Sequence, residues 1–189
     1  PFLLVFSLLF NFYTMPPFLE ESARFAQLLS ELKEKPVLVL GHRRPDGDCI
    51  GSQVGLTRVL IELGVDARAV NQDPVPRTLQ KFVGTTPFFR PDEIEGNDFT
   101  VVMVDCADKH RIGESLSKRF PEVFLNIDHH VSNTKYAKTN FVLSDASATG
   151  EILAKFFLDS QMTIDSTTVD ALYVGIATDT GQFCYGGTN

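Results

Sequence analysis

Short apolar runs alternate with amphipathic segments along most of the chain. The runs are typical of strands buried inside a parallel sheet, and they cover residues 36–41, 65–71, 99–105 and 123–130. Around them, apolar residues recur every three or four positions, which predicts helices over residues 17–35, 50–64, 147–160 and 166–181, and a short helix within residues 111–122. This alternation predicts a three-layer α/β/α fold built on a mainly parallel sheet.

Residues 1–14, PFLLVFSLLFNFYT, are apolar and uncharged, unlike the rest of the chain. This segment is too short to span a bilayer, and it lacks the basic start and the small-residue cleavage site of a signal peptide. Because Met15 fits a native start, we expect residues 1–14 to be a non-native or disordered leader, with a membrane or partner anchor as the alternative. The 189 residues are long enough for one good-sized hydrophobic core, or for one domain and a fragment of another.

Charge and cysteine content exclude several classes of partner. The formal net charge of −7 argues against an extended polynucleotide surface, although bound divalent cations would still permit a local site for an anionic ligand. The three cysteines form no CxxC pair and no disulfide framework, which favours a reducing, cytoplasmic setting. We expect neither long nucleic acid nor a membrane as a partner.

Acidic residues and histidines gather where apolar segments end. Because the carboxyl ends of parallel strands meet at one edge of a sheet, we expect these side chains to converge in a crevice there. Mixed carboxylate and imidazole ligands suit Mn²⁺, Fe²⁺, Co²⁺ or Zn²⁺, and the number of ligands indicates two ions that share a bridging carboxylate. The candidates are His42, Asp46, Asp48, Asp105, Asp108, Asp128, His129, His130 and Asp179.

Each candidate also has a purely structural interpretation. A single Asp after a strand is usually a helix cap or a turn residue, Pro45-Asp46-Gly47 is a good turn signal, and a single buried His is usually a core residue. What the structural interpretation explains poorly is the coincidence of such groups at successive strand ends. Gly51 and Ser52 open a helix whose N–H groups suit a phosphate, although helix packing explains the glycine equally well. No Walker or GxSxG motif occurs.

Four segments together resemble the motifs of the DHH phosphoesterase superfamily. They are HRRPDGDCIGS at 42–52, VVMVDCAD at 101–108, DHH at 128–130 and GIATDTGQF at 175–183, in that order. The resemblance covers residues 37–183. With SDASATGE at 144–151, it is closest to the bacterial nano-RNases and 3′-phosphoadenosine 5′-phosphate phosphatases.

The resemblance implies a role for each matching residue. It implies two divalent ions, most simply Mn²⁺, the first held by His42, Asp46 and Asp105. The second would be held by Asp48, Asp105, His129 and Asp179, so that Asp105 is the bridge. His130 would face the scissile phosphate as a catalytic residue beside Asp105. Supporting or substrate contacts are expected from Asp128, Arg111 and Ser52, whereas Asp108 is expected to be structural.

The resemblance also implies substrates and a missing part. The expected substrates are short oligoribonucleotides and 3′-phosphoadenosine 5′-phosphate. A homodimer is one candidate assembly, and the sequence alone does not decide the oligomeric state. The alternatives are a linear or cyclic dinucleotide phosphodiesterase, a family II pyrophosphatase, and an inactive nucleotide-binding fragment. Residues 15–189 would be the catalytic domain, truncated before the C-terminal substrate-binding domain (DHHA1). Cys49 and Cys106 replace the usual small residues, and we interpret them as small buried side chains.

Overall fold

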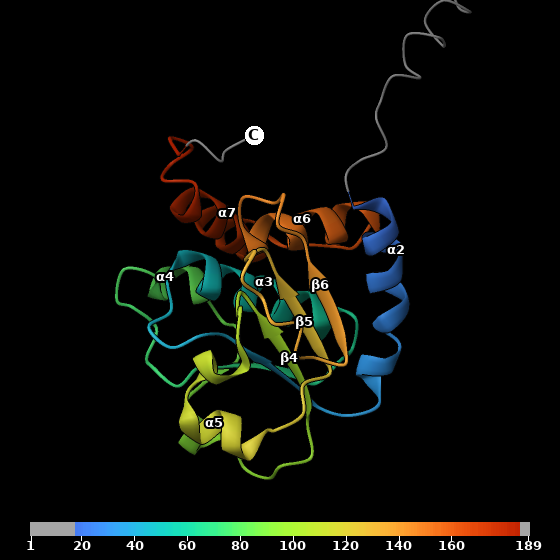
Figure 1. Ribbon diagram of the computed structural model, residues 1–189, viewed down its shortest axis with the longest axis vertical. Coiled ribbons are helices and arrows are strands. Elements are labelled where there is room, and N and C mark those ends of the chain that lie inside the picture. Colours follow the sequence, from blue (N-terminus) through green and yellow to red (C-terminus); the bar gives the residue numbers. More distant parts are fainter. Residues whose placement is uncertain (1–17, 186–189) are drawn as a thin grey trace, which may run out of the picture.

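A six-stranded parallel sheet forms the centre of the computed structural model, which describes residues 18–185 (Figure 1). The order across the sheet is β3-β2-β1-β4-β5-β6, and every neighbouring pair is parallel. The predicted α/β/α class is confirmed, and residues 1–14 lie outside the described part of the chain. The strands are β1 (Val37–Leu40), β2 (Ala67–Val70), β3 (Phe88–Phe89), β4 (Thr100–Val104), β5 (Leu125–Asp128) and β6 (Thr139–Val142).

Helices cover both faces of the sheet (Figure 1), which explains why β1 is wholly apolar and why β4 is apolar after its first residue. Val37 and Val39 of β1 belong to a large core with the longer helices, whereas Leu38 and Leu40 belong to a smaller core on the other face. The large core includes side chains of α2 (Leu19–Leu28), α3 (Gly47–Glu62), α6 (Thr149–Asp159) and α7 (Ser166–Asp179). The smaller core contains side chains of η4 (Lys109–Ile112) and α5 (Glu114–Arg119). The remaining short helices are η2 (Glu31–Lys33), α4 (Gln80–Val83) and η3 (Pro91–Glu93).

Several predicted boundaries differ from the structure. Helix α3 begins at Gly47 rather than at residue 50, because Asp46 caps it by accepting a hydrogen bond from the backbone N–H of Cys49. The predicted helix over 17–35 divides into α2 and η2. The short helix expected within 111–122 is α5, which begins after Gly113, whose φ is +102°. The prediction missed the edge strands β3 and β6: β3 is only two residues long, and β6 mixes polar and apolar residues.

The strand order reverses between β1 and β4. The connections that leave these two strands therefore diverge and open a crevice at the carboxyl edge of the sheet. His42 follows β1 and Asp105 follows β4, so both residues lie at this point.

The N-terminal half of α3 lies directly against α7. A Cβ on Gly51 would be only 2.2 Å from the backbone oxygen of Ala171, and one on Gly47 would be 2.2 Å from Oγ1 of Thr178. Glycine at these positions allows an approach that any larger residue would block. The contact brings the start of α3, with Asp48, to the end of α7, with Asp179.

Within residues 18–185, no helix combines the length and the apolar character needed to cross a bilayer.

Candidate metal centre

Asp105 lies at the centre of the acidic and imidazole groups. It directly follows β4, is 2% exposed, and has a φ of +54°, a left-handed conformation that Asp adopts more readily than most residues. Its Oδ2 is 3.3 Å from Nε2 of His42, and its Oδ1 is 3.8 Å from Nε2 of His129. The two oxygens of one carboxylate therefore face two different groups of side chains.

The first group contains His42, Asp46 and Asp105. Nδ1 of His42 is 2.8 Å from the carbonyl oxygen of Arg43, so it carries the hydrogen and donates it. In the neutral ring, the lone pair is then on Nε2, which faces Asp105 Oδ2 at 3.3 Å and Asp46 Oδ2 at 3.6 Å. Asp46 uses Oδ1 to cap α3 and directs Oδ2 at His42, so a role as helix cap is compatible with a role as metal ligand.

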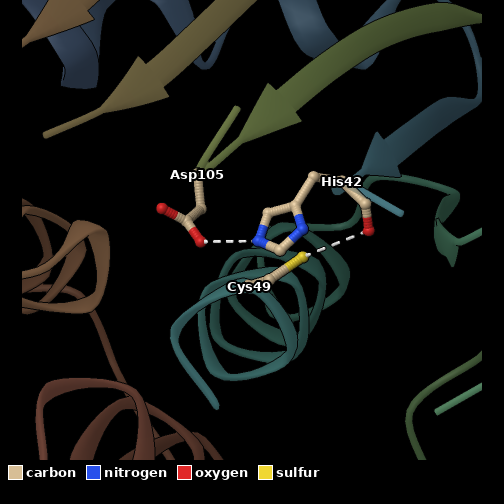
Figure 2. A group of neighbouring side chains, drawn as sticks. All are labelled: His42, Cys49 and Asp105. Carbon is tan, nitrogen blue, oxygen red and sulfur yellow. Dashed lines mark hydrogen bonds and ion pairs between the residues drawn. The ribbon is translucent and has the colours of Figure 1, made fainter. Parts of the chain in front are cut away.

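Cys49 lies beside this first group. Figure 2 shows His42 and Asp105 directed toward one another next to α3, which carries Cys49. The Cys49 sulfur is 3.9 Å from the carbonyl oxygen of His42, and burial raises the pKa of this thiol to about 11. Burial likewise raises the pKa of Cys106 to about 12. Both thiols are thus held in the protonated form, as expected for small buried side chains.

The second group contains Asp48, His129 and Asp179. One ligand atom from each of these residues lies within 4.8 Å of those of the other two. Nδ1 of His129 is 3.4 Å from the carbonyl oxygen of Ala146, which leaves Nε2 to face Asp179 Oδ2 at 3.2 Å. That Nε2 is buried and makes no hydrogen bond to any described residue.

Asp48 is fully buried and stabilises a helix other than its own. Its Oδ2 accepts a hydrogen bond from the backbone N–H of Thr149 at 2.7 Å, and its Oδ1 accepts one from Gly150 at 2.8 Å. These are the first two residues of α6, so Asp48 satisfies donors that the helix itself leaves unpaired. Ser52 is also fully buried and donates to Asp48 Oδ1 at 3.3 Å, a supporting contact.

The electrostatics of the two groups favour bound cations. Burial, together with the charges of Asp105 and Asp179, raises the pKa of Asp48. Burial alone would lower the pKa of His129, but Asp179, Asp48 and Asp105 outweigh it and raise that pKa to about 9. Asp179 also ends α7, where the helix dipole disfavours negative charge. Divalent ions would relieve this repulsion and would bind His129 through Nε2, which makes no hydrogen bond to a described residue, so the residues present fit a metal centre.

His130 is held differently from His129. Its Nδ1 donates to Asp128 Oδ1 at 2.8 Å, and its side chain is 33% exposed. Asp128 is fully buried, and Asn133 donates to its other oxygen at 2.6 Å. Burial would raise the pKa of Asp128, but hydrogen bonds from His130 and Asn133 lower it, so it remains a carboxylate. With Nδ1 occupied, Nε2 of His130 is the ring atom left for a ligand.

Two other candidates lie on η4. Asp108 caps this short helix by accepting a hydrogen bond from the backbone N–H of His110 at 2.8 Å, which is the structural role expected for it. Arg111 is exposed, and its backbone oxygen accepts a hydrogen bond from the N–H of Arg43 at 2.7 Å. The structure does not bring the Arg111 side chain into either group of ligands.

Sequence reasoning did not single out Asn133, Thr149 and Gly150, which hold Asp128 and Asp48. Thr149 and Gly150 lie in the SDASATGE segment, which matched the motif pattern without indicating a role for either residue. No signal in the sequence marked Asn133.

Together, the fold and the cluster define an α/β domain with a candidate dinuclear metal centre at the switch point of a parallel sheet. The chain belongs to the DHH family: the family described as "DHH family, N-terminal domain" matches residues 36–176.

Curated relatives agree with this assignment. The chain is 31% identical to the bifunctional oligoribonuclease and PAP phosphatase NrnA of Thermus thermophilus, over 92% of this chain and 52% of that protein. It is 29% identical to the probable bifunctional oligoribonuclease and PAP phosphatase NrnA of Streptococcus mutans, over 87% of this chain and 52% of that protein. It thus spans about half the length of these relatives.

A solved structure, an exopolyphosphatase-related protein from Bacteroides fragilis, is similar in fold with a TM-score of 0.75. The two chains are 21% identical, and the match covers 89% of this chain and 52% of the other.

Proposed function

We propose that the protein is a metal-dependent phosphoesterase that hydrolyses short oligoribonucleotides and 3′-phosphoadenosine 5′-phosphate. The observation that carries the proposal is the orientation of the Asp105 carboxylate, whose two oxygens face two separate groups of potential ligands. The names of the two NrnA relatives support the substrates. The net charge of −7 supports short rather than long nucleic acids.

Each group would hold one ion. We assign the first to His42, Asp46 and Asp105, and the second to Asp48, Asp105, His129 and Asp179. The mixture of imidazole and carboxylate donors supports Mn²⁺ over Mg²⁺, which prefers oxygen ligands. When bound, two such ions would activate a water molecule and neutralise charge on the phosphoryl oxygens.

His130 has the geometry of the catalytic residue. Asp128 accepts the Nδ1 hydrogen at 2.8 Å, and this leaves Nε2, on the far side of the ring from that contact, as the atom that would carry a proton toward the substrate. That proton would bond a non-bridging phosphoryl oxygen and stabilise charge in the transition state, or pass to the leaving oxygen. Asn133 keeps Asp128 in place.

The three cysteines are free thiols, two of them buried, and this supports a reducing, cytoplasmic location.

The test is turnover with Mn²⁺ on four substrates: a linear diribonucleotide, 3′-phosphoadenosine 5′-phosphate, a cyclic dinucleotide and inorganic pyrophosphate. We expect the first two to be hydrolysed fastest, with activity lost in excess chelator and restored by Mn²⁺. Asp105→Asn is the inactive control. Equal turnover in chelator would contradict metal dependence, and preference for pyrophosphate or the cyclic dinucleotide would contradict the substrate assignment.

A further inference from the structure

Thr149, the first residue of α6, contacts both of the central carboxylates. It is fully buried, its Oγ1 donates to Asp105 Oδ1 at 3.2 Å, and its backbone N–H donates to Asp48 Oδ2 at 2.7 Å. One residue thus connects the carboxylate shared by the two groups with a carboxylate that belongs only to the second.

The hydroxyl contact determines how Asp105 is rotated. The terminal torsion of an Asp side chain has a broad energy minimum, so a carboxylate turns easily unless hydrogen bonds hold it. Thr149 holds Oδ1 on the side of His129, and this leaves Oδ2 to face His42 at 3.3 Å. A carboxylate that bridges two ions through both of its oxygens requires this division.

The residues around Thr149 hold other parts of the same centre. Gly150 donates to Asp48 Oδ1 at 2.8 Å, and a Cβ at this position would be only 3.1 Å from that oxygen. The carbonyl oxygen of Ala146 lies 3.4 Å from Nδ1 of His129. Glu151 accepts hydrogen bonds at 2.8 Å from both the backbone N–H and the hydroxyl of Ser147, which fixes the turn.

We propose that residues 146–151 form the positioning element of the metal centre, and that the Thr149 hydroxyl orients Asp105 so that it bridges two ions. Thr149 is a positioning residue, because it acts through Asp105. The inference rests on the dinuclear centre of the proposed function. It goes further by identifying the Thr149 hydroxyl as the group that makes binding at one ion site depend on the other.

Thr149→Val distinguishes the orientation of Asp105 by the Thr149 hydroxyl from a purely structural role of the residue. The change keeps the shape of the side chain and the backbone N–H that Asp48 accepts, and removes only the hydroxyl. Thr149→Ser restores the hydroxyl. Thr57→Val is the matched control, because Thr57 is also fully buried and its hydroxyl has no hydrogen-bond partner among the described residues.

The experiment is titration of the 189-residue chain and its variants with Mn²⁺ alone, by calorimetry and by electron paramagnetic resonance. We expect the unsubstituted chain to bind two equivalents with the spin coupling of a bridged pair. In Thr149→Val we expect the second equivalent to bind about tenfold or more weakly, the scale of one hydrogen bond to a charged group, with loss of spin coupling. Thr149→Ser and Thr57→Val should both keep two coupled equivalents.

Three results would overturn the inference. They are unchanged Mn²⁺ binding in Thr149→Val, failure of Thr149→Ser to restore the coupling, and an equal loss in Thr57→Val. The proposed function fails separately if two Mn²⁺ bind as expected while none of the four substrates is hydrolysed. Binding of fewer than two equivalents by the unsubstituted chain would overturn the dinuclear centre and the role of Thr149 together.

Discussion

The close contact between α3 and α7 predicts that Gly51→Ala destabilises the protein. In most helix interiors, replacement of Gly by Ala is stabilising by about 1 kcal/mol, because Gly loses more backbone freedom on folding. At Gly51 the new Cβ would lie 2.2 Å from the carbonyl oxygen and 3.1 Å from the carbonyl carbon of Ala171. Both are backbone atoms of the facing helix, so no change of rotamer relieves the overlap.

The size of the effect follows from these two opposing contributions. Overpacking of a well-packed core costs about 1–3 kcal/mol, and a clash with helix backbone belongs at or above the upper end of that range. After subtraction of the gain in helix propensity, we expect the free energy of unfolding to fall by about 2 kcal/mol. For a chain of this size, that lowers Tm by roughly 4–8 °C.

Gly55→Ala is the matched control, one turn further along the same helix. A Cβ there would meet only side-chain atoms of Leu172, with Cδ2 at 2.8 Å and Cγ at 3.1 Å, and a change of rotamer can relieve this contact. We expect the Gly55→Ala protein to remain within about 1 kcal/mol of the unsubstituted chain. The assay is thermal and urea unfolding in chelator, so that metal binding does not contribute.

Either of two results would refute this reasoning: Gly51→Ala as stable as the unsubstituted chain, or an equal loss in Gly55→Ala. Because α3 carries Asp48 and α7 carries Asp179, Gly51→Ala should also weaken Mn²⁺ binding, whereas Gly55→Ala should not.

Three further predictions concern the candidate centre itself. Mn²⁺ at about 100 times its Kd should stabilise the protein by about 2.7 kcal/mol, which raises Tm by roughly 5–11 °C in a thermal scan. Asp105→Asn should abolish this rise in Tm, and an unchanged rise in that variant would contradict the bridging role. His130→Ala should lower kcat by about 10²–10⁴-fold with two Mn²⁺ still bound, and loss of one Mn²⁺ would show that His130 is a ligand. The pKa of His129 is raised from 6.5 to about 9, so its ion pair with Asp179 stabilises the metal-free protein below about pH 6.5, and this contribution is lost as the pH rises through 9. Urea unfolding across that range should therefore show falling stability that is flatter in His129→Gln, and identical slopes would contradict the assignment.

Local features of the sequence predicted the parts of this protein that depend on neighbouring residues. The apolar run at residues 37–40 is buried on both faces of the sheet, and polar residues at its end mark the edge where ligands gather. Asp46 caps helix α3, and its residue type and its position before the helix both indicate that role. The acidic and imidazole candidates were visible because each follows an apolar segment at a regular place in the α/β pattern.

Contacts between distant segments decided the rest. Asp48 and Thr149 are 101 positions apart, and only the packing of α3 against α6 makes the Asp48 carboxylate a cap for another helix. The positive φ of Asp105 and the division of its two oxygens depend on β5, on Thr149 and on two histidines from different loops. Strand β6 forms by pairing with β5. Its four residues are too few for an alternation of polar and apolar positions that would predict a strand. Sequence patterns record which residues prefer burial or a helix end, whereas the pairing of buried polar atoms is a property of the assembled fold.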